Sequence, residues 1–336
     1  MNLKNIKQVL QDEPKYRLKQ AKNAVFRQLA HDWQEVNVFP LALRERLNKE
    51  APLAIEAEVY VSKDKDSVKA VLTLKDDLKI ETVLMRHHDG RNTVCVSSQV
   101  GCPLACKFCA TGKMGFFRNL EVFEIVDQIL FFSRLLKKEN QRVKNIVFMG
   151  MGEPFLNYDN VLEAIRILND QDGLNIGARH ISISTIGIVD GIQKLAEENL
   201  QLNLAISLHA SNDMLRETLM PIGKTYKISD ILKAVNDYLK KTKRKVMFEY
   251  LLLNNINDSQ EHALELAKLM KHHLYFLNLI LYNPTGSEFK ASSSERVKAF
   301  RQVLTDEGVN FVQRYRFGEE IHAACGQLAA PPKLKV

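Results

Sequence analysis

The sequence predicts an α/β fold, a partial (β/α)6 barrel preceded by a small N-terminal helical domain. The chain has 336 residues and is 46% hydrophobic, which is enough to bury one barrel core and one smaller core. From Asn92 onward, six short β-rich runs alternate with helical patterns, and a polar motif follows most of the runs. Six strand-helix units imply a parallel sheet, and they are too few for a complete eight-stranded barrel.

Residues 1–75 differ from the rest of the chain and are predicted to form the small basic helical domain. Residues 1–30 carry seven Lys or Arg against Asp12 and Glu13, and their apolar residues recur at helical spacing. Residues 62–85 then alternate apolar and polar side chains, which predicts a β-hairpin leading into the main domain. The main domain is assigned to residues 76–330, and residues 331–336 are a tail.

The six predicted strands of the barrel are rich in β-branched and aromatic residues. They are TVCVSSQ (93–99), NIVFMG (145–150), HISIST (180–185), LNLAISLH (202–209), KVMFEYLLL (245–253) and FLNLILYNP (276–284). Amphipathic stretches lie between most of them. In residues 120–136, one helical face carries only apolar side chains, namely Val122, Ile125, Val126, Ile129 and Leu130.

Polar motifs follow these strands and are expected to meet at one rim. A cysteine loop follows the first strand and GMGEP (150–154) follows the second. Ser184 and Thr185 end the third strand, residues 207–209 end the fourth, and Asn283 with Pro284 ends the sixth. Active sites of such barrels lie at the C-terminal ends of the strands, so the sequence predicts the site there.

The cysteine loop indicates an iron-sulfur cluster. Cys102, Cys106 and Cys109 are spaced four and then three residues apart, while Cys95 and Cys325 are left over. A four-iron cluster takes four ligands, so three thiolates leave one iron open to a non-protein ligand. A zinc site is the alternative, although structural zinc usually takes a fourth protein ligand close by. A disulfide framework is a weaker alternative.

Composition indicates an enzyme of the cytoplasm with a polyanionic partner. The net charge is +7 and the pI is about 9.0, although a modest positive excess also occurs in proteins that bind no polyanion. No apolar run reaches the length of a membrane span, and the first twenty residues lack the apolar region of a secretory leader. We therefore expect no membrane association.

With its CxxxCxxC loop, GMGEP, the strand-end motifs and a distant ACGQL (324–328), the chain resembles the radical SAM RNA methyltransferases of the RlmN/Cfr family. The resemblance extends from about Lys15 to Ala329, with the motifs in the family order. A CxxxCxxC motif alone would imply only radical SAM chemistry, whereas its pairing with a distant ACGQL is highly specific. The motifs are CVSSQVGCPLACKFCATGKMGFFRNL (95–120), VFMGMGEPFLN (147–157), ISISTIGI (181–188), AISLHA (205–210), YNP (282–284) and AACGQL (323–328).

The resemblance implies that Cys102, Cys106 and Cys109 hold one 4Fe–4S cluster, whose open iron chelates S-adenosylmethionine (SAM). Gly152 and Glu153 would contact the methionine amine, which suits a carboxylate. The remaining SAM positions would be filled by Ser184, Ser207, Leu208, His209 and Asn283. His209 is also plausible as a packed histidine at a strand end.

The family chemistry gives the two spare cysteines roles. Carbons 2 and 8 of adenine are too weakly nucleophilic to take a methyl group from SAM directly. In the family, one SAM methylates a cysteine, which Cys325 matches, and a second SAM is cleaved to a radical that activates this methyl group. Cys95 matches the thiol that releases the product through a transient disulfide, and Glu81 matches the carboxylate that accepts the ring proton.

The implied partners are 23S rRNA, with tRNA as a second substrate, and an electron donor such as flavodoxin or ferredoxin; the protein is expected to act as a monomer. The basic N-terminal domain and the runs 137–144 and 240–245 are candidate RNA contacts. Pro154 in GMGEP resembles the branch that methylates carbon 2 of an rRNA adenine, whereas Ile186 resembles the antibiotic-resistance branch that methylates carbon 8. A radical SAM enzyme with a non-RNA substrate and a non-catalytic iron-sulfur protein remain alternatives.

Overall fold

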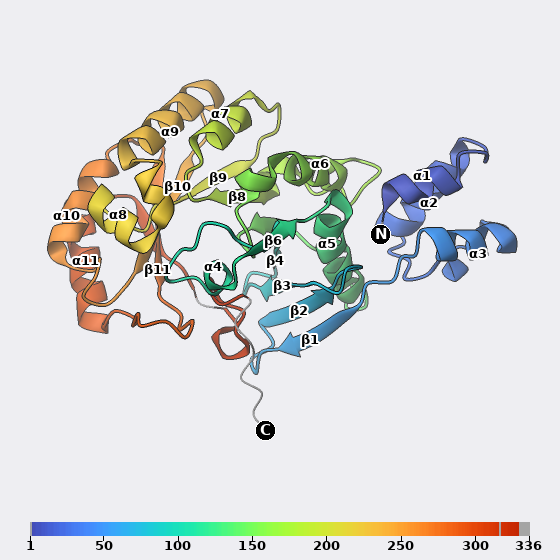
Figure 1. The fold of residues 1–336 in the computed structure, drawn as a ribbon, viewed down its shortest axis with the longest axis horizontal. Coiled ribbons are helices and arrows are strands. Elements are labelled where there is room, and N and C mark those ends of the chain that lie inside the picture. Colours follow the sequence, from blue (N-terminus) through green and yellow to red (C-terminus); the bar gives the residue numbers. More distant parts are fainter. Residues whose placement is uncertain (1, 316, 329–336) are drawn as a thin grey trace.

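Three N-terminal helices form a small unit at one end of the molecule (Figure 1). The computed structural model describes residues 2–315 and 317–328, so the predicted tail 331–336 lies outside the described residues. The helices are α1 (Leu3–Val9), α2 (Tyr16–Phe26) and α3 (Leu41–Glu50). Trp33 is fully buried among them, and its indole nitrogen donates to the carbonyl oxygen of Ala51 at 2.8 Å. This small core keeps the helices together.

The predicted hairpin is confirmed, and it belongs to the main sheet. β1 (Ala57–Val61), β2 (Ser67–Thr73) and β3 (Lys79–Arg86) are antiparallel, and β3 pairs with the first barrel strand. The predicted boundary at residue 75 therefore falls in the turn between β2 and β3, and the helical unit ends with α3. The alternation in residues 62–85 predicted the hairpin, but nothing local in the sequence marked that β1 and β2 join the barrel sheet.

The six predicted barrel strands are present, parallel and adjacent in the order of the chain. They are β4 (Asn92–Cys95), β7 (Asn145–Phe148), β8 (Ile181–Thr185), β9 (Asn203–Ser207), β10 (Val246–Leu252) and β11 (Tyr275–Leu281). A further parallel strand, β12 (Phe311–Gln313), pairs with β11 and was not predicted. The whole ladder has ten strands in the order β1-β2-β3-β4-β7-β8-β9-β10-β11-β12.

Helices cover the outer side of the curved sheet (Figure 1). They are α5 (Val122–Lys137), α6 (Tyr158–Asn169), α7 (Val189–Glu197), α9 (Ile228–Thr242), α10 (Gln260–Leu269) and α11 (Ser294–Asp306). In α5, Ile125 and Ile129 of the predicted apolar face are fully buried, and a capping box between Glu121 and Glu124 starts the helix. No helix in the described part of the chain is long and apolar enough to cross a bilayer.

The cysteine loop projects from a separate two-stranded ladder. β5 (Gln99–Gly101) pairs with β6 (Phe116–Asn119), and short helix α4 (Ala110–Met114) lies between them. Gly101 has a φ of +76°, and a Cβ there would lie 1.9 Å from the carbonyl oxygen of Gly115. The loop can therefore close only with glycine at residue 101. This closure holds the loop over the C-terminal ends of the barrel strands.

Candidate active site

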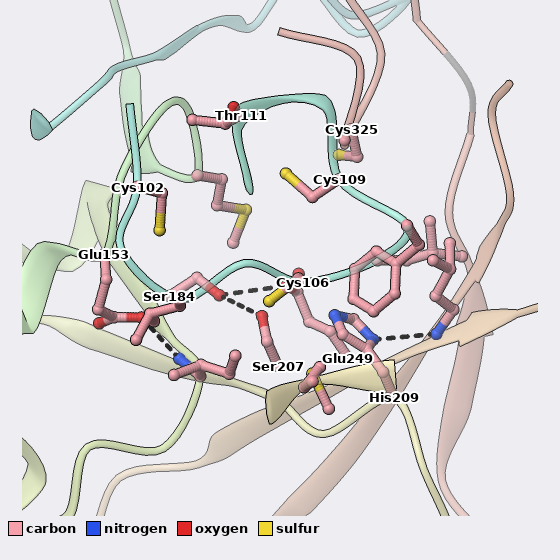
Figure 2. A pocket seen from close by; sticks show the side chains of 18 of the residues that line it. Cys102, Cys106, Cys109, Thr111, Glu153, Ser184, Ser207, His209, Glu249 and Cys325 are labelled. Atoms are coloured by element: carbon pink, nitrogen blue, oxygen red, sulfur yellow. Dashed lines mark hydrogen bonds between the residues drawn. The ribbon is translucent and has the colours of Figure 1, made fainter. Parts of the chain in front are cut away.

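The three clustered cysteines line one cavity at the C-terminal rim of the barrel. All three are free thiols, and Figure 2 shows them around a common space that also faces Glu153, Ser184 and Ser207. The amide of Cys102 donates to the carbonyl oxygen of Gly115 at 2.8 Å, and that of Cys109 donates to Cys106 at 3.1 Å. Burial raises the pKa of Cys102 to about 12 and that of Cys106 well above its ordinary value. A bound cation would be needed to hold both as thiolates.

Glu153 is a buried carboxylate on this cavity wall. Its Oε1 accepts from the amide of Phe155 at 3.0 Å and its Oε2 accepts from the amide of Ile186 at 2.9 Å. Burial raises the pKa of Glu153 to about 7, against the opposing effect of these two amides. Neighbouring Gly152 has a φ of +94°, and a Cβ there would lie 2.5 Å from Gln99. GMGEP therefore brings a carboxylate and bare backbone to the cavity.

Ser184 and Ser207 face each other at the ends of β8 and β9. Their hydroxyl oxygens lie 3.2 Å apart, and Ser184 also donates to Oε2 of Glu249 at 3.2 Å. Sequence reasoning missed Glu249, which lies inside a predicted strand. Its other oxygen, Oε1, is buried and accepts no hydrogen bond from a described residue; the guanidinium of Arg314 lies 3.5 Å away.

His209 lies in the cavity wall and is packed as the second interpretation predicts, while its contact with SAM stays a prediction. Its φ is +56°, and its Nδ1 accepts from the amide of Leu251 at 3.1 Å. The ring makes an edge contact with Phe108 at 5.2 Å, and burial lowers its pKa to about 3. His209 is therefore a neutral wall residue. Adjacent Leu208 is fully buried and does not line this cavity.

Cys325 connects this cavity to a second one. The second cavity is lined by Cys95, Cys325, Asn283 and Arg314, among others. Nδ2 of Asn283 donates to the carbonyl oxygen of Cys325 at 3.3 Å, while its Oδ1 is buried without a described hydrogen-bond partner. Burial, with a smaller contribution from Cys325, raises the pKa of Cys95 to about 12. Both are free thiols, so the predicted transient disulfide remains a prediction.

Two unpredicted basic residues stand next to predicted ones. Arg314 lines both cavities, and the charge of Cys325 is the main cause that raises its pKa. Glu81 lines neither cavity but is buried in an ion pair with Lys69 at 3.1 Å. Neither basic residue could be found from the sequence alone. Lys69 lies within a hairpin strand and Arg314 lies just after a short strand, and their contacts depend on segments that are distant in the chain.

The two basic runs lie at the end of the barrel opposite this cavity. Residues 137–144 immediately precede β7, and residues 240–245 immediately precede β10. Both runs are therefore at the N-terminal ends of strands whose C-terminal ends form the site. Two of their lysines pair locally, Lys240 with Asp237 and Lys241 with Glu197. The runs therefore do not line this cavity, and their contact with RNA stays a prediction.

Comparison with known proteins identifies the family. The model of the radical SAM superfamily matches residues 96–267. A ribosomal RNA large subunit methyltransferase N of Nitrosopumilus maritimus is 45% identical, covering 94% of this chain and 92% of the relative. A probable dual-specificity RNA methyltransferase RlmN of Dictyoglomus thermophilum is 44% identical, covering 95% and 91%. The chain belongs to the radical SAM methyltransferases of the RlmN family.

A solved radical SAM methyltransferase shares the architecture. The crystal structure of a radical SAM methyltransferase from Sphaerobacter thermophilus superimposes with a TM-score of 0.94 at 41% identity, covering 98% of both chains. The predicted α/β fold, a partial radical SAM barrel with a small N-terminal helical unit, is thereby confirmed. So is the prediction of a SAM-dependent methyltransferase.

The residues present fit the 4Fe–4S cluster and SAM that the family implies. A cubane binds each thiolate at a separate iron, so its three ligands must line one cavity without converging on one point. The cysteines do line one cavity, and no three His, Cys, Asp or Glu side chains of the described residues come close enough to hold a single metal ion. Oε1 of Glu249 lines this cavity, faces the Arg314 guanidinium at 3.5 Å and accepts no hydrogen bond from a described residue, so it is an acceptor suited to a polar cofactor such as SAM.

Proposed function

We propose that the protein methylates carbon 2 of an adenine in 23S rRNA, and a tRNA adenine as a second substrate, through a methylcysteine intermediate. The observation that carries this proposal is the position of Cys325. It lines the cavity of the three clustered cysteines and also the cavity of Cys95. The Cys325 thiol could therefore receive a methyl group in the first cavity and be attacked by the Cys95 thiol from the second.

The residues around the first cavity would hold the cofactors. Cys102, Cys106 and Cys109 would bind the cluster, which when bound supplies the electron that cleaves SAM to a 5′-deoxyadenosyl radical. Gly152 and Glu153 would bind the methionine amine. Ser184, Ser207 and His209 of this cavity would contact the rest of SAM, and Asn283, which of the two cavities lines only the second, would reach SAM from beside Cys325. Leu208 would act by packing behind them, because it is fully buried.

The two spare thiols would divide methyl transfer between them. The Cys325 thiolate would displace the methyl group of SAM, forming an S–CH₃ bond and releasing S-adenosylhomocysteine. After the activated methyl carbon has joined the adenine ring, Glu81 would accept the proton that leaves the ring carbon. The Cys95 thiolate would then attack the sulfur of Cys325 and form a disulfide. The carbon–sulfur bond would break, its electron pair would stay with the methylene carbon, and a proton from solvent would complete the methyl group of the freed base.

Carbon 2 is favoured over carbon 8 by Pro154 and by the greater frequency of the carbon-2 branch. The curated relatives of 41–45% identity carry the RlmN name, and GMGEP carries the proline typical of the carbon-2 branch. Ile186, whose amide donates to Glu153, is the observation that keeps carbon 8 as the second candidate. We also propose that the N-terminal helical unit contacts RNA, and that the protein acts as a cytoplasmic monomer reduced by a flavodoxin- or ferredoxin-like donor.

Mass spectrometry of nuclease fragments of 23S rRNA and tRNA tests this proposal. A strain lacking the gene should lack one methyladenosine, and the wild-type gene should restore it as 2-methyladenosine. The Cys325→Ala gene is the matched control and should restore nothing. Restoration of 8-methyladenosine would show that the target is carbon 8 and not carbon 2. If neither RNA differed between the strains, the proposed function would be refuted.

A further inference from the structure

The strand register places Lys69, Glu81 and Cys95 on one face of the sheet. Lys69 of β2 lies opposite Val83 of β3, and Val83 lies opposite Cys95 of β4. Residues opposite each other in a ladder point to the same face, and so do residues two apart along a strand. Glu81, two residues before Val83, therefore shares this face with the other two. Cys95 lines the second cavity with Cys325, so the face looks toward that cavity.

Lys69 is a fully buried cation in contact with two functional segments. Its Nζ lies 3.1 Å from Oε1 of Glu81 and 3.4 Å from the carbonyl oxygen of His322. His322 precedes Cys325 by three residues. The Nζ also lies 5.4 Å from the centre of the Tyr60 ring. One side chain thus joins the proposed proton acceptor to the segment that carries the proposed methyl carrier.

Stability alone is a weak reason for a buried pair of this kind. Removing both charges from water is costly, and an apolar side chain of similar volume often stabilises such a site as well or better. Another pair in the same antiparallel strands shows the contrast. Lys79 and Glu58 approach to 2.8 Å with more than half of each side chain exposed, which is an ordinary surface pair of small effect.

The backbone of Glu81 is tied to the SAM-binding motif from the other side. The hydroxyl of Ser97 donates to the carbonyl oxygen of Glu81 at 2.6 Å, and the amide of Met151 donates to that hydroxyl at 2.8 Å. Met151 belongs to the GMGEP motif. Glu81 is therefore fixed to the first cavity through its backbone and to the Cys325 segment through its carboxylate.

We propose that Lys69 is the positioning residue that orients the Glu81 carboxylate toward the adenine attached to Cys325, a proposal that rests on the proposed function. A charged lysine donates hydrogen bonds and accepts none. It can therefore hold the carboxylate without competing for the ring proton. Its second bond, to the His322 carbonyl, sets the distance between this carboxylate and the Cys325 segment.

Lys69→Met tests this role, with Lys79→Met as the matched control. Two steps are measured on the reconstituted, full-length protein: methylation of Cys325 by intact mass, and single-turnover release of methylated RNA. Lys69→Met should methylate Cys325 at the wild-type rate but release product about tenfold or more slowly. This is less than the roughly 10²–10⁴-fold that a general base contributes, because the Glu81 carboxylate is misplaced and not removed. RNA deuterated at carbons 2 and 8 of adenine should slow release further in this variant. Lys79→Met should behave as wild type in both steps.

A double mutant separates positioning from simple stabilisation. If Lys69 acts through Glu81, adding Lys69→Met to Glu81→Gln should slow release no further. The proposal would be overturned if release in the double mutant were slowed by the product of the two single-mutant fold-changes. Loss of Cys325 methylation in Lys69→Met would overturn it as well. Lys69→Gln keeps a donor for the His322 carbonyl and should show the same loss, so the proposal stays testable if the Met variant folds poorly. Cys325 methylation reports on the proposed function and product release reports on Lys69, so their failures are distinguishable.

Discussion

Replacing Glu153 with Gln should weaken SAM binding without removing the cluster. Gln removes the charge but keeps one acceptor oxygen, whereas Ala would remove the acceptors of both the Phe155 and Ile186 amides. Each buried amide left without a partner costs about 1–3 kcal/mol of folding free energy, so Gln is the gentler change. A hydrogen bond that involves a charged group contributes about 1.5–3 kcal/mol, which corresponds to a rise in the SAM Kd of roughly 10- to 150-fold.

Anaerobic calorimetry of SAM binding to the reconstituted protein measures this change. Glu124→Gln is the matched control, because Glu124 is also a buried carboxylate that accepts a backbone amide, that of Glu121 at 2.8 Å, but lies outside both cavities. Its SAM Kd should equal that of the wild type. A Glu153→Gln protein with full iron content and unchanged SAM affinity would refute the role given to this carboxylate.

Three further predictions address the cysteines and His209. Cys106→Ala should lose the brown colour and most iron after anaerobic reconstitution; a colourless wild-type protein with one bound zinc would contradict the cluster. Cys95→Ala should accumulate a covalent RNA adduct through Cys325 that shrinks on nuclease digestion, and normal turnover would argue against two-thiol chemistry. His209 has a pKa of about 3 when folded and about 6.5 when unfolded. The stability that its neutral ring contributes is therefore fully present above pH 6.5 and is lost as the pH drops below that value. The free energy of unfolding of the cluster-free protein, measured in urea, should fall by about 2 kcal/mol more for wild type than for His209→Gln when the pH is lowered from 7 to 5. Equal decreases in the two proteins would contradict a neutral buried ring.

The barrel could be predicted because each of its six strands is recognisable from its own short run of residues. Five of the six apolar runs were seen to end in polar motifs, and the parallel arrangement then brings these residues to one rim. Glu153, Ser184, Ser207 and the cysteine loop were all found in this way, and they do line one cavity. Strand direction also contained the information that the basic runs before β7 and β10 lie at the opposite rim.

Long-range contacts could not be predicted in the same way. β12 has only three residues and forms because β11 offers it an edge. From the sequence, Lys69 is expected to be an exposed polar residue of an alternating hairpin. It is buried, and it contacts the segment around His322, which is more than 240 residues away in the chain. Glu249 was hidden because a carboxylate within an apolar strand gives no sign of the face to which it points.

The ladder runs in one line from β1 to β12, so in the described residues no backbone pairing joins its first strand to its last. The segment carrying Cys325 lies across this side of the barrel, from the hairpin, where the amide of Lys63 donates to Glu320 at 2.6 Å, to the cysteine loop, where the amide of Ala110 donates to the carbonyl oxygen of Gly326 at 2.8 Å. Side chains of Thr111 and Asn283 also donate to carbonyl oxygens of this segment, at 3.0 and 3.3 Å, so scattered hydrogen bonds and not a strand ladder hold it in place. Cys325, the proposed methyl carrier, thus lies on the side of the barrel where no backbone ladder of the described residues stands between a substrate and its thiol.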